Sequence, residues 1–391
     1  MNSIHKRSLS GLRIIVLGYI VRGPLGGLAW HHLQYVLGLI QLGHQVSFVE
    51  QSENFPSCYD PIRGVMDTDP TYGLRFASKA FSHLDIPDCW AYHDAHTSRW
   101  LGPAAGRIHE ICKTADLLLN LSGVNPIRPW FSEIPVRVFV DTDPAFTQIR
   151  HLTDPASRSL AAQHTAFLSF GENIAEGAAR IPADGFAWQA TRQPVVLDAW
   201  KDTPGREQGR FTTVMQWDSY AVREYEGVRY GMKSLSFDPI LDLPGRTSEK
   251  LELAIGSATA PRRLLRQAGW YLRDPLRVTQ DPWSFQRYIA RSKAEFTVAK
   301  HGYVISNSGW FSERSANYLA SGRPVVTQQT GFSRWLRADA GVVPFETAEE
   351  ALLAIEDVSA HYDAHCRTAR EIVHEYFNAN KILGRVLNQI G

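Results

Sequence analysis

Residues 301–332, HGYVISNSGWFSERSANYLASGRPVVTQQTGF, contain the side chains whose types and spacing best suit a binding site. Ser312 is a natural N-cap and Glu313 suits the positive end of a helix dipole, so we expect a helix over 312–321. The start of such a helix offers unpaired N–H groups, which bind phosphate well, and Arg314 could add a charged fork. These residues predict a diphosphate site, although a plain helix cap and a surface ion pair are the alternative.

Strands and helices alternate on both sides of this segment. The runs 12–18 and 45–50 frame a βαβ unit with a Gly-rich turn, and 51–100 reads as a loop-rich insertion. Further strands are predicted at 116–121, 136–141, 165–169, 194–198, 211–217, 251–255, 270–274, 296–300, 324–328 and 341–345. Helices are predicted at 284–294, 312–321 and 348–357, with one long final helix over 360–388. This order predicts an α/β fold of two Rossmann-like, doubly wound domains that face a cleft.

The chain has 391 residues, which is too long for one ordinary core. We expect an N-terminal Rossmann-like domain over 1–205 and a C-terminal one over 206–370. A helix over 371–391 should cross back to the N-terminal domain. The polar, turn-rich stretch 201–210, KDTPGREQGR, is the candidate hinge.

Composition limits the classes of partner. Lys and Arg total 41 and Asp and Glu total 40, so no field of one sign attracts nucleic acid or a membrane surface. The four cysteines have neither metal-ligand spacing nor the density of a disulfide scaffold. The first residues, MNSIHKRSLSG, form a polar tail and not a signal peptide, and no apolar stretch is long enough to span a bilayer. We therefore expect a cytoplasmic protein without nucleic-acid partners or stable membrane insertion; its oligomeric state stays open.

The run SANYLASGRPVV, after a Gly-aromatic loop, resembles nucleotide-sugar glycosyltransferases of the GT-B fold. Several of these place an acidic residue where Asn317 stands and a second one where Gly309 stands, and Glu313 could replace part of that pair. The resemblance implies an NDP-sugar donor, with UDP as the first candidate, and no metal or other cofactor. The donor-binding residues that we expect are Gly26, Gly27, Trp217, His301, Gly309, Ser312, Glu313, Arg314, Ser315, Asn317, Thr330 and Gly331.

The first half offers candidates for the acceptor side. The turn RGPLGGLAWHH lacks the G-x-G-x-x-G register, so a dinucleotide site is weakly supported. By resemblance, His31 or His32 would be the base that deprotonates the acceptor. A neighbouring carboxylate would orient that base, and Asp141 or Asp143, at the carboxyl end of a strand, is well placed for this. Asp141 in VDTDP could alternatively bind a metal ion or cap the backbone. The acceptor-binding residues that we expect are Asp143, Trp188 and Arg192.

These expectations combine into a metal-independent transfer of a sugar from an NDP-sugar to a small-molecule acceptor. Two alternatives of the same architecture stay open at this point, a nucleotide-sugar epimerase and a sugar phosphorylase. A third is a non-catalytic protein that binds a sugar or a nucleotide, because a fold alone does not prove activity.

Overall fold

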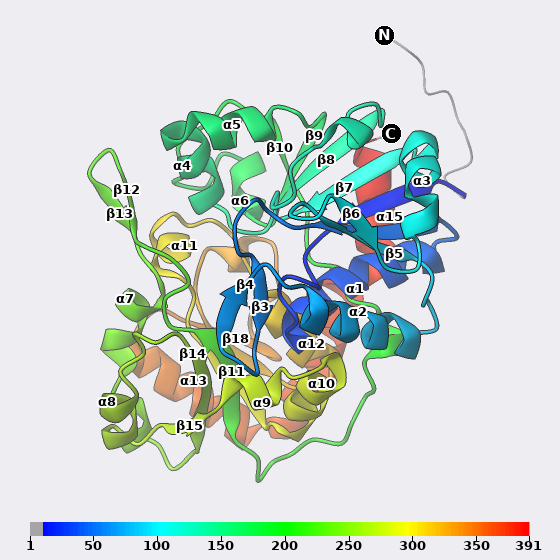
Figure 1. Cartoon of the computed structure of the whole chain (residues 1–391). Helices are drawn as coiled ribbons and strands as arrows, with labels where there is room; N and C mark the ends of the chain where they lie inside the picture. Colours follow the sequence, from blue (N-terminus) through cyan, green and yellow to red (C-terminus); the bar gives the residue numbers. More distant parts are fainter. Residues whose placement is uncertain (1–10, 391) are drawn as a thin grey trace.

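The computed structural model describes residues 11–390, so most of the polar N-terminal tail lies outside the described residues. An eight-stranded sheet forms the first half, in the order β10-β9-β8-β7-β1-β2-β5-β6 (Figure 1). Only β5 and β6 pair antiparallel in it. Its strands are β1 (Arg13–Leu17), β2 (Gln45–Gln51), β5 (Trp90–Asp94), β6 (Arg99–Leu101), β7 (Leu117–Leu121), β8 (Val136–Asp141), β9 (Ala166–Ser169) and β10 (Trp188–Ala190).

A six-stranded parallel sheet forms the second half, in the order β15-β14-β11-β16-β17-β18. In each sheet the first strand, β1 or β11, has later strands on both sides, as in a doubly wound fold. All six strands predicted for this half are confirmed within three residues. They are β11 (Phe211–Gln216), β14 (Leu251–Gly256), β15 (Tyr271–Arg273), β16 (Ala294–Thr297), β17 (Val325–Gln328) and β18 (Val342–Phe345).

Helices cover the faces of both sheets (Figure 1). Those of the first half are α1 (Gly26–Gln41), α2 (Thr71–His83), α3 (Ile108–Thr114), α4 (Phe146–Thr153), α5 (Pro155–Ala161) and α6 (Glu172–Ala175). Those of the second half are α7 (Lys233–Phe237), α8 (Arg262–Gln267), α9 (Pro275–Val278), α10 (Pro282–Arg291), α11 (His301–Ile305), α12 (Glu313–Ala320) and α13 (Ala348–Ala360). No helix of residues 11–390 combines the length and apolar character needed to cross a membrane.

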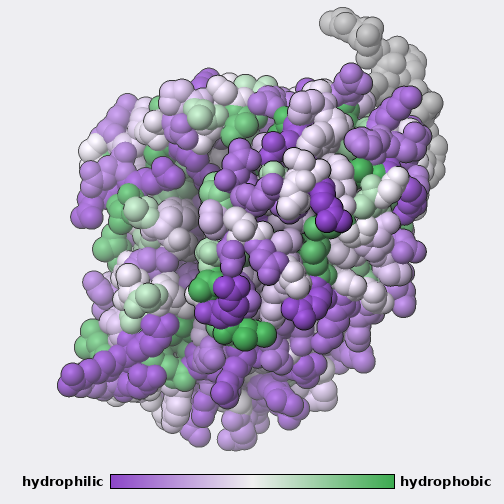
Figure 2. Space-filling view, in the orientation of Figure 1, coloured by the Kyte–Doolittle hydropathy of each residue, from purple (hydrophilic) through white to green (hydrophobic). Residues whose placement is uncertain are grey.

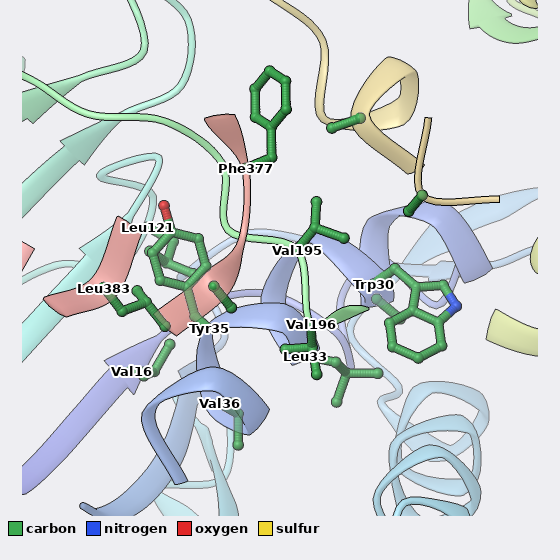
Figure 3. Packing of buried hydrophobic residues seen from close by; sticks show 14 of the residues in the cluster. Val16, Trp30, Leu33, Tyr35, Val36, Leu121, Val195, Val196, Phe377 and Leu383 are labelled. Atoms are coloured by element: carbon green, nitrogen blue, oxygen red, sulfur yellow. The ribbon is translucent and has the colours of Figure 1, made fainter. Parts of the chain in front are cut away.

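The C-terminal segment crosses from the second half of the chain, where its first helix packs on α12 and α13, to the first half, where its last helix packs on α1. It forms two helices, α14 (Tyr362–Tyr376) and α15 (Ala379–Ile390), so the prediction of one long helix is wrong. Leu383 of α15 is buried in one cluster with Val16 and Tyr35 (Figure 3). At the break between the helices, the carbonyl of Phe377 accepts the N–H of Val195 over 2.7 Å.

The break between α14 and α15 also explains why the strand predicted at 194–198 is wrong. The apolar pattern of 194–198 predicts a strand, but the run forms a single bridge, between Val195 and Asn378. The edge strand of the first sheet is β10 instead. Val195 and Val196 are buried because they pack against α1 and the break between the final helices, which a local pattern does not reveal.

The predicted loop-rich insertion over 51–100 contains regular structure as well. A hairpin of β3 (Cys58–Asp60) and β4 (Val65–Asp67) precedes α2 and the strands β5 and β6. The hairpin exposes the apolar side chains of Ile62, Val65 and Met66. Figure 2 shows green, apolar surface there, within hydrophilic surroundings.

The segment 201–210 joins the two sheets without a helix or strand. Arg323, which is fully buried, donates from its guanidinium to the carbonyls of Thr203 (3.1 Å) and Pro204 (2.9 Å). It also donates to the carbonyl of Ala290 at 2.7 Å. One buried cation therefore fixes the start of the predicted hinge.

Candidate active site in the cleft between the sheets

A cavity of about 680 Å³ lies at the carboxyl ends of β11 and β14, where ligands bind in open α/β sheets. Both halves of the chain form its walls. The first half contributes Gly23, Leu25, Gly27, Leu28 and Tyr59. The second half contributes Val214, Met215, Gln216, Gly256, Ser257, Arg262, Asp274, Pro275, Leu276, Thr279, Phe285, Glu313, Arg314 and Asn317.

The start of α12 forms part of this cavity. Ser312 caps the helix by accepting the N–H of Arg314 at 3.2 Å. Glu313 is the first residue of the helix and lines the cavity. Ser315 is fully buried, and its Oγ has no hydrogen-bond partner among the described residues. The helix dipole therefore adds positive potential to this wall.

Arg314 differs from its predicted role as a free phosphate fork. Its Nε donates to the buried carboxylate of Glu295, and its two terminal nitrogens donate to the carbonyl of Val214 (2.9 Å) and to Oγ1 of Thr297 (2.8 Å). Arg314 lines the cavity, yet these bonds fix its guanidinium against the sheet. Because Glu295 neutralises its charge, Arg314 mainly holds this wall of the cavity in place.

Lys233, the first residue of α7, is a candidate phosphate partner near this site, although it does not line the cavity. Its side chain is buried, and residues 11–390 provide it with no ion pair or side-chain hydrogen bond. Burial lowers the pKa of Lys233 well below its ordinary value, and the charges of Arg314 and Lys300 add to this shift. Glu295 and Glu313 oppose it. An unpartnered amine in such surroundings would gain greatly from an anionic ligand.

Asn317 holds the two halves together. Its Oδ1 accepts a hydrogen bond from Nε2 of Gln34 in α1, over 3.0 Å. The two amides are 2% exposed, and Asn317 also lines the cavity. The predicted donor residue is therefore at the cavity, and part of its bonding capacity serves the contact between the sheets.

The turn after β1 is organised by a carboxylate. Glu50, at the end of β2, accepts the N–H groups of Ile20 (2.7 Å), Val21 (2.7 Å) and Arg22 (2.6 Å). Three successive N–H groups would otherwise form an anion-binding nest. Because Glu50 already fills that nest, the turn does not bind a phosphate there, in agreement with its missing dinucleotide motif.

Gly26 and Gly27 bring the first helix close to the second half. The N–H of Gly26 donates to the carbonyl of Thr279 at 2.6 Å. A Cβ at Gly26 would lie 2.2 Å from the carbonyl oxygen of Asp281, so only glycine permits this approach. Gly26 therefore joins the two halves, whereas Gly27 lines the cavity.

The two adjacent histidines of α1 have different environments. His32 donates from Nδ1 to the carbonyl of Leu28 (2.8 Å) and accepts the N–H of Tyr19 at Nε2 (3.2 Å), so both of its nitrogens are used. The Nε2 of His31 is buried and lacks a partner among residues 11–390. Burial lowers the pKa of His31, and the charge of Glu313 opposes that shift. These contacts remove His32 from the candidate bases and leave His31.

Asp141 and Asp143 are fully engaged with protein groups. Asp141 is buried and accepts from Thr147 (2.7 Å), Gln148 (3.1 Å) and Ser169 (2.7 Å). Burial raises the pKa of Asp141, and these hydrogen bonds oppose the shift. Asp143 pairs with Lys300 at 2.8 Å. Asp141 therefore supports its own loop and does not orient either histidine of α1.

Several predicted donor residues have structural roles outside the cavity wall. Trp217 is buried against Phe237, with ring centroids 5.0 Å apart, so its neighbour Gln216 is the residue that faces the cavity. His301 lies beside the hairpin of β12 (Arg223–Tyr225) and β13 (Val228–Tyr230), where burial lowers its pKa.

The loop around Gly309 and Gly331 meets the first half at Asn173. The side-chain amide of Asn173 donates to the carbonyls of Asn307 (2.8 Å) and Gly331 (3.2 Å). Gly309 and Gly331 have φ values of 76° and 90°, and a Cβ on either would collide with Asn173. Thr330 donates its hydroxyl to the carbonyl of Trp310. Gly309 and Gly331 contact the first half of the chain, whereas Thr330 bonds within the second half, and none of the three lines the cavity.

The predicted acceptor-binding residues Trp188 and Arg192 also lie away from the cavity. Trp188 donates from Nε1 to Asp184 at 2.9 Å and packs in an aromatic cluster beside β8. Arg192 pairs with Glu172 and lies 4.2 Å above the ring of Trp335. Neither lines the cavity, so both serve packing in this structure.

One group of described residues has the spacing of a metal site, Asp357, His361 and His365. His365 accepts the N–H of Gly341 at Nδ1 over 3.1 Å, which places its proton on Nε2, facing Asp357. A ligating histidine normally donates from its second nitrogen. The group therefore connects the end of α13 to the start of α14 by hydrogen bonds and is not a metal centre.

No protein-family model and no curated protein matches the sequence. Solved structures with a similar fold include an alpha-glucosyltransferase in complex with UDP-glucose and DNA containing an abasic site (TM-score 0.56, 10% identity, 96% of this chain and 98% of that chain). AviGT4, a glycosyltransferase involved in avilamycin A biosynthesis, has a TM-score of 0.50 at 13% identity, with 97% of each chain covered. HepE of Anabaena in complex with UDP and glucose has a TM-score of 0.56 at 10% identity, with 97% and 99% covered. The chain therefore has the GT-B fold of these glycosyltransferases, as its sequence predicted.

Proposed function

We propose that this chain is a glycosyltransferase that moves a sugar from a nucleoside diphosphate sugar to a small-molecule acceptor. The observation that carries the proposal is the cavity between the sheets, which the start of α12 lines. The unpartnered Lys233 does not line this cavity but is close enough to Glu313 and Arg314 for their charges to affect it. Solved structures of the same fold hold UDP or UDP-glucose, and this favours UDP as the nucleotide.

The donor diphosphate would lie between Lys233 and the N-terminus of α12. A diphosphate there returns the lysine to its charged form and accepts N–H groups at the helix start. The nucleoside would extend along the walls formed by the second half, past Ser257 and Asp274. The acceptor would enter from the side of Gly23, Leu28 and Tyr59.

We further propose that transfer needs no metal ion. The carboxylates of the VDTDP turn are the natural ligands for one, yet Asp141 and Asp143 are each held by several protein donors. The charge of Lys233 and the partial positive charge of the helix start would stabilise the leaving diphosphate instead. His31 is the candidate base, since its lowered pKa keeps the imidazole neutral at pH 7.

A thermal-shift comparison of UDP, GDP, TDP and ADP, with and without EDTA, tests donor binding. A ligand at 100 times its Kd adds about 2.7 kcal/mol, so the Tm should rise by a few degrees with one nucleotide. Lys233→Ala should remove the rise, whereas Lys250→Ala, an exposed lysine of the same half, should keep it. No rise with any nucleotide at millimolar concentration would contradict the proposal.

Labelled donor then tests the acceptor. Transfer to hydroxyl-bearing small molecules supports the proposal, which rests on the near balance of 41 basic and 40 acidic residues. Duplex DNA belongs in the same panel, because one similar structure contains DNA. Label that appears only on DNA would overturn the small-molecule part and leave the donor part intact.

A further inference from the structure

A second cavity, of about 460 Å³, lies in the C-terminal half on the other side of α9. Pro275 and Leu276 of α9 face the cleft, and Arg277 and Val278 line the second cavity. Five arginines and a single glutamate line it. The full lining is Gln208, Gly209, Arg210, Thr212, Glu252, Arg273, Arg277, Val278, Gln280, Ser284, Arg287, Tyr288, Arg291 and Ser292.

The single carboxylate is already neutralised. Glu252 is 3% exposed and forms ion pairs with Arg210 (2.5 Å) and Arg273 (2.6 Å). The hydroxyl of Tyr288 donates to it at 3.0 Å. Glu252 therefore offsets one of the two positive charges of Arg210 and Arg273 and has no capacity left for the other arginines.

Three arginines at the rim remain without a close acidic partner. Arg287 donates to Ser284 at 2.7 Å, and the side chain of Arg291 forms no ion pair or hydrogen bond within residues 11–390. Arg277 is 3.9 Å from Asp274, and both side chains are exposed to solvent. Arg287 and Arg291 are four residues apart on α10, so they lie on one face of the helix.

The excess of positive charge belongs to this cavity and not to the chain as a whole. The whole chain carries 41 basic and 40 acidic residues, whereas this cavity has five arginines to one glutamate. Figure 2 shows mainly hydrophilic surface over α9 and α10. Like charges gathered in one concave site repel each other, and a bound anion removes that repulsion. Planar guanidinium forks match phosphate oxygens in particular.

We propose that this cavity is a second anion site, which binds a small molecule carrying two or more phosphate groups. The phosphates would lie between Arg277 of α9 and the arginine pair of α10. Because α9 separates the two cavities, occupancy would also fix α9 beside the Thr279 carbonyl that binds Gly26. Binding of a phosphate compound at this site would then influence the cleft through α9, whatever reaction the cleft catalyses.

Calorimetric titration with inorganic tripolyphosphate, at low ionic strength, tests the proposal on the full chain. The double variant Arg287→Ala/Arg291→Ala should bind at least tenfold more weakly, since removing one charged hydrogen bond lowers affinity by about that factor. The matched control is Arg263→Ala/Arg266→Ala on α8, two exposed arginines of the same half that do not line the cavity. It should bind like the unchanged protein.

A third variant separates the two cavities. Lys233→Ala should remove only tripolyphosphate binding at the proposed donor site, and the binding that the Arg287→Ala/Arg291→Ala variant weakens should remain. Abolished binding in Lys233→Ala alone would place the anion in the cleft and overturn the second site. Equal weakening in the two arginine doubles, or no binding to the unchanged protein, would overturn it as well. Melting curves of each variant establish that the variants are folded. Arg291→Glu reverses one charge of the cavity and provides a second variant whose loss of binding does not depend on the double substitution.

Discussion

Gln34 of α1 donates a hydrogen bond of 3.0 Å to Asn317 of α12, and its own Oε1 accepts the N–H of Val196 at 2.6 Å. One buried amide thus joins the first helix of the N-terminal half, the cavity helix of the C-terminal half and the segment that leads to the linker. The position where the GT-B signature favours an acid serves here as a joint between the halves.

Gln34→Leu should lower the free energy of unfolding by about 1–3 kcal/mol, because the buried N–H of Val196 loses its acceptor. Urea denaturation at pH 7 measures this decrease. Gln189→Leu, on the exposed side of β10, is the control and should unfold like the unchanged protein. Equal unfolding free energies for the two variants would show that the joint adds no stability.

Asp143 connects the halves through charge. Burial alone would raise the pKa of Asp143, but Lys300 and the hydroxyls of Tyr220 and Tyr303 outweigh it and lower the pKa. A carboxyl with a lowered folded pKa contributes stability that is present above its unfolded value of about 3.9 and is lost as the pH falls through the folded value.

Asp143→Asn should therefore lower stability by about 2 kcal/mol at pH 7 and flatten its acid dependence. Urea midpoints between pH 3 and pH 7 measure both effects. Asp198→Asn, which changes an exposed carboxylate, is the control and should retain the acid dependence. If the stability of Asp143→Asn falls as steeply with decreasing pH as that of the unchanged protein, then other groups cause the fall.

Local pattern was sufficient for most of the fold, because strands of parallel sheets are continuous apolar runs such as RIIVL in β1. It failed for 194–198, where an equally apolar run pairs with a helix break 183 residues further along the chain, at Asn378. In the site, residue type correctly marked the start of α12. The partner of Arg314, Glu295 in a neighbouring strand, was not visible from spacing, and neither was the lack of a partner at Lys233 among the described residues. Both depend on contacts across the sheet.

Gly26→Ala should disturb the contact between the halves, since the added Cβ would lie 2.2 Å from the carbonyl oxygen of Asp281. Something must move, and the nearest moving parts are α1 and the α9–α10 junction, which border the cavity. We expect a lower Tm and weaker nucleotide binding together. Gly106→Ala is the control, because a Cβ there meets nothing within 4 Å. Unchanged nucleotide affinity in Gly26→Ala would mean that the cavity tolerates the displacement.

His31 and His32 should respond differently to the same substitution. His32→Ala removes the acceptor for the N–H of Tyr19 and should cost about 1–3 kcal/mol of stability. His31→Ala should keep the fold and donor binding but lower kcat about 10²–10⁴-fold, because it removes the proposed base that takes a proton from the sugar acceptor. Because burial lowers the pKa of His31, the acid limb of activity should lie below the ordinary value of about 6.5. Steady-state rates across pH, with a nucleotide thermal shift on each variant, separate the two roles; an acid limb that persists in His31→Ala would exclude His31 as the titrating group.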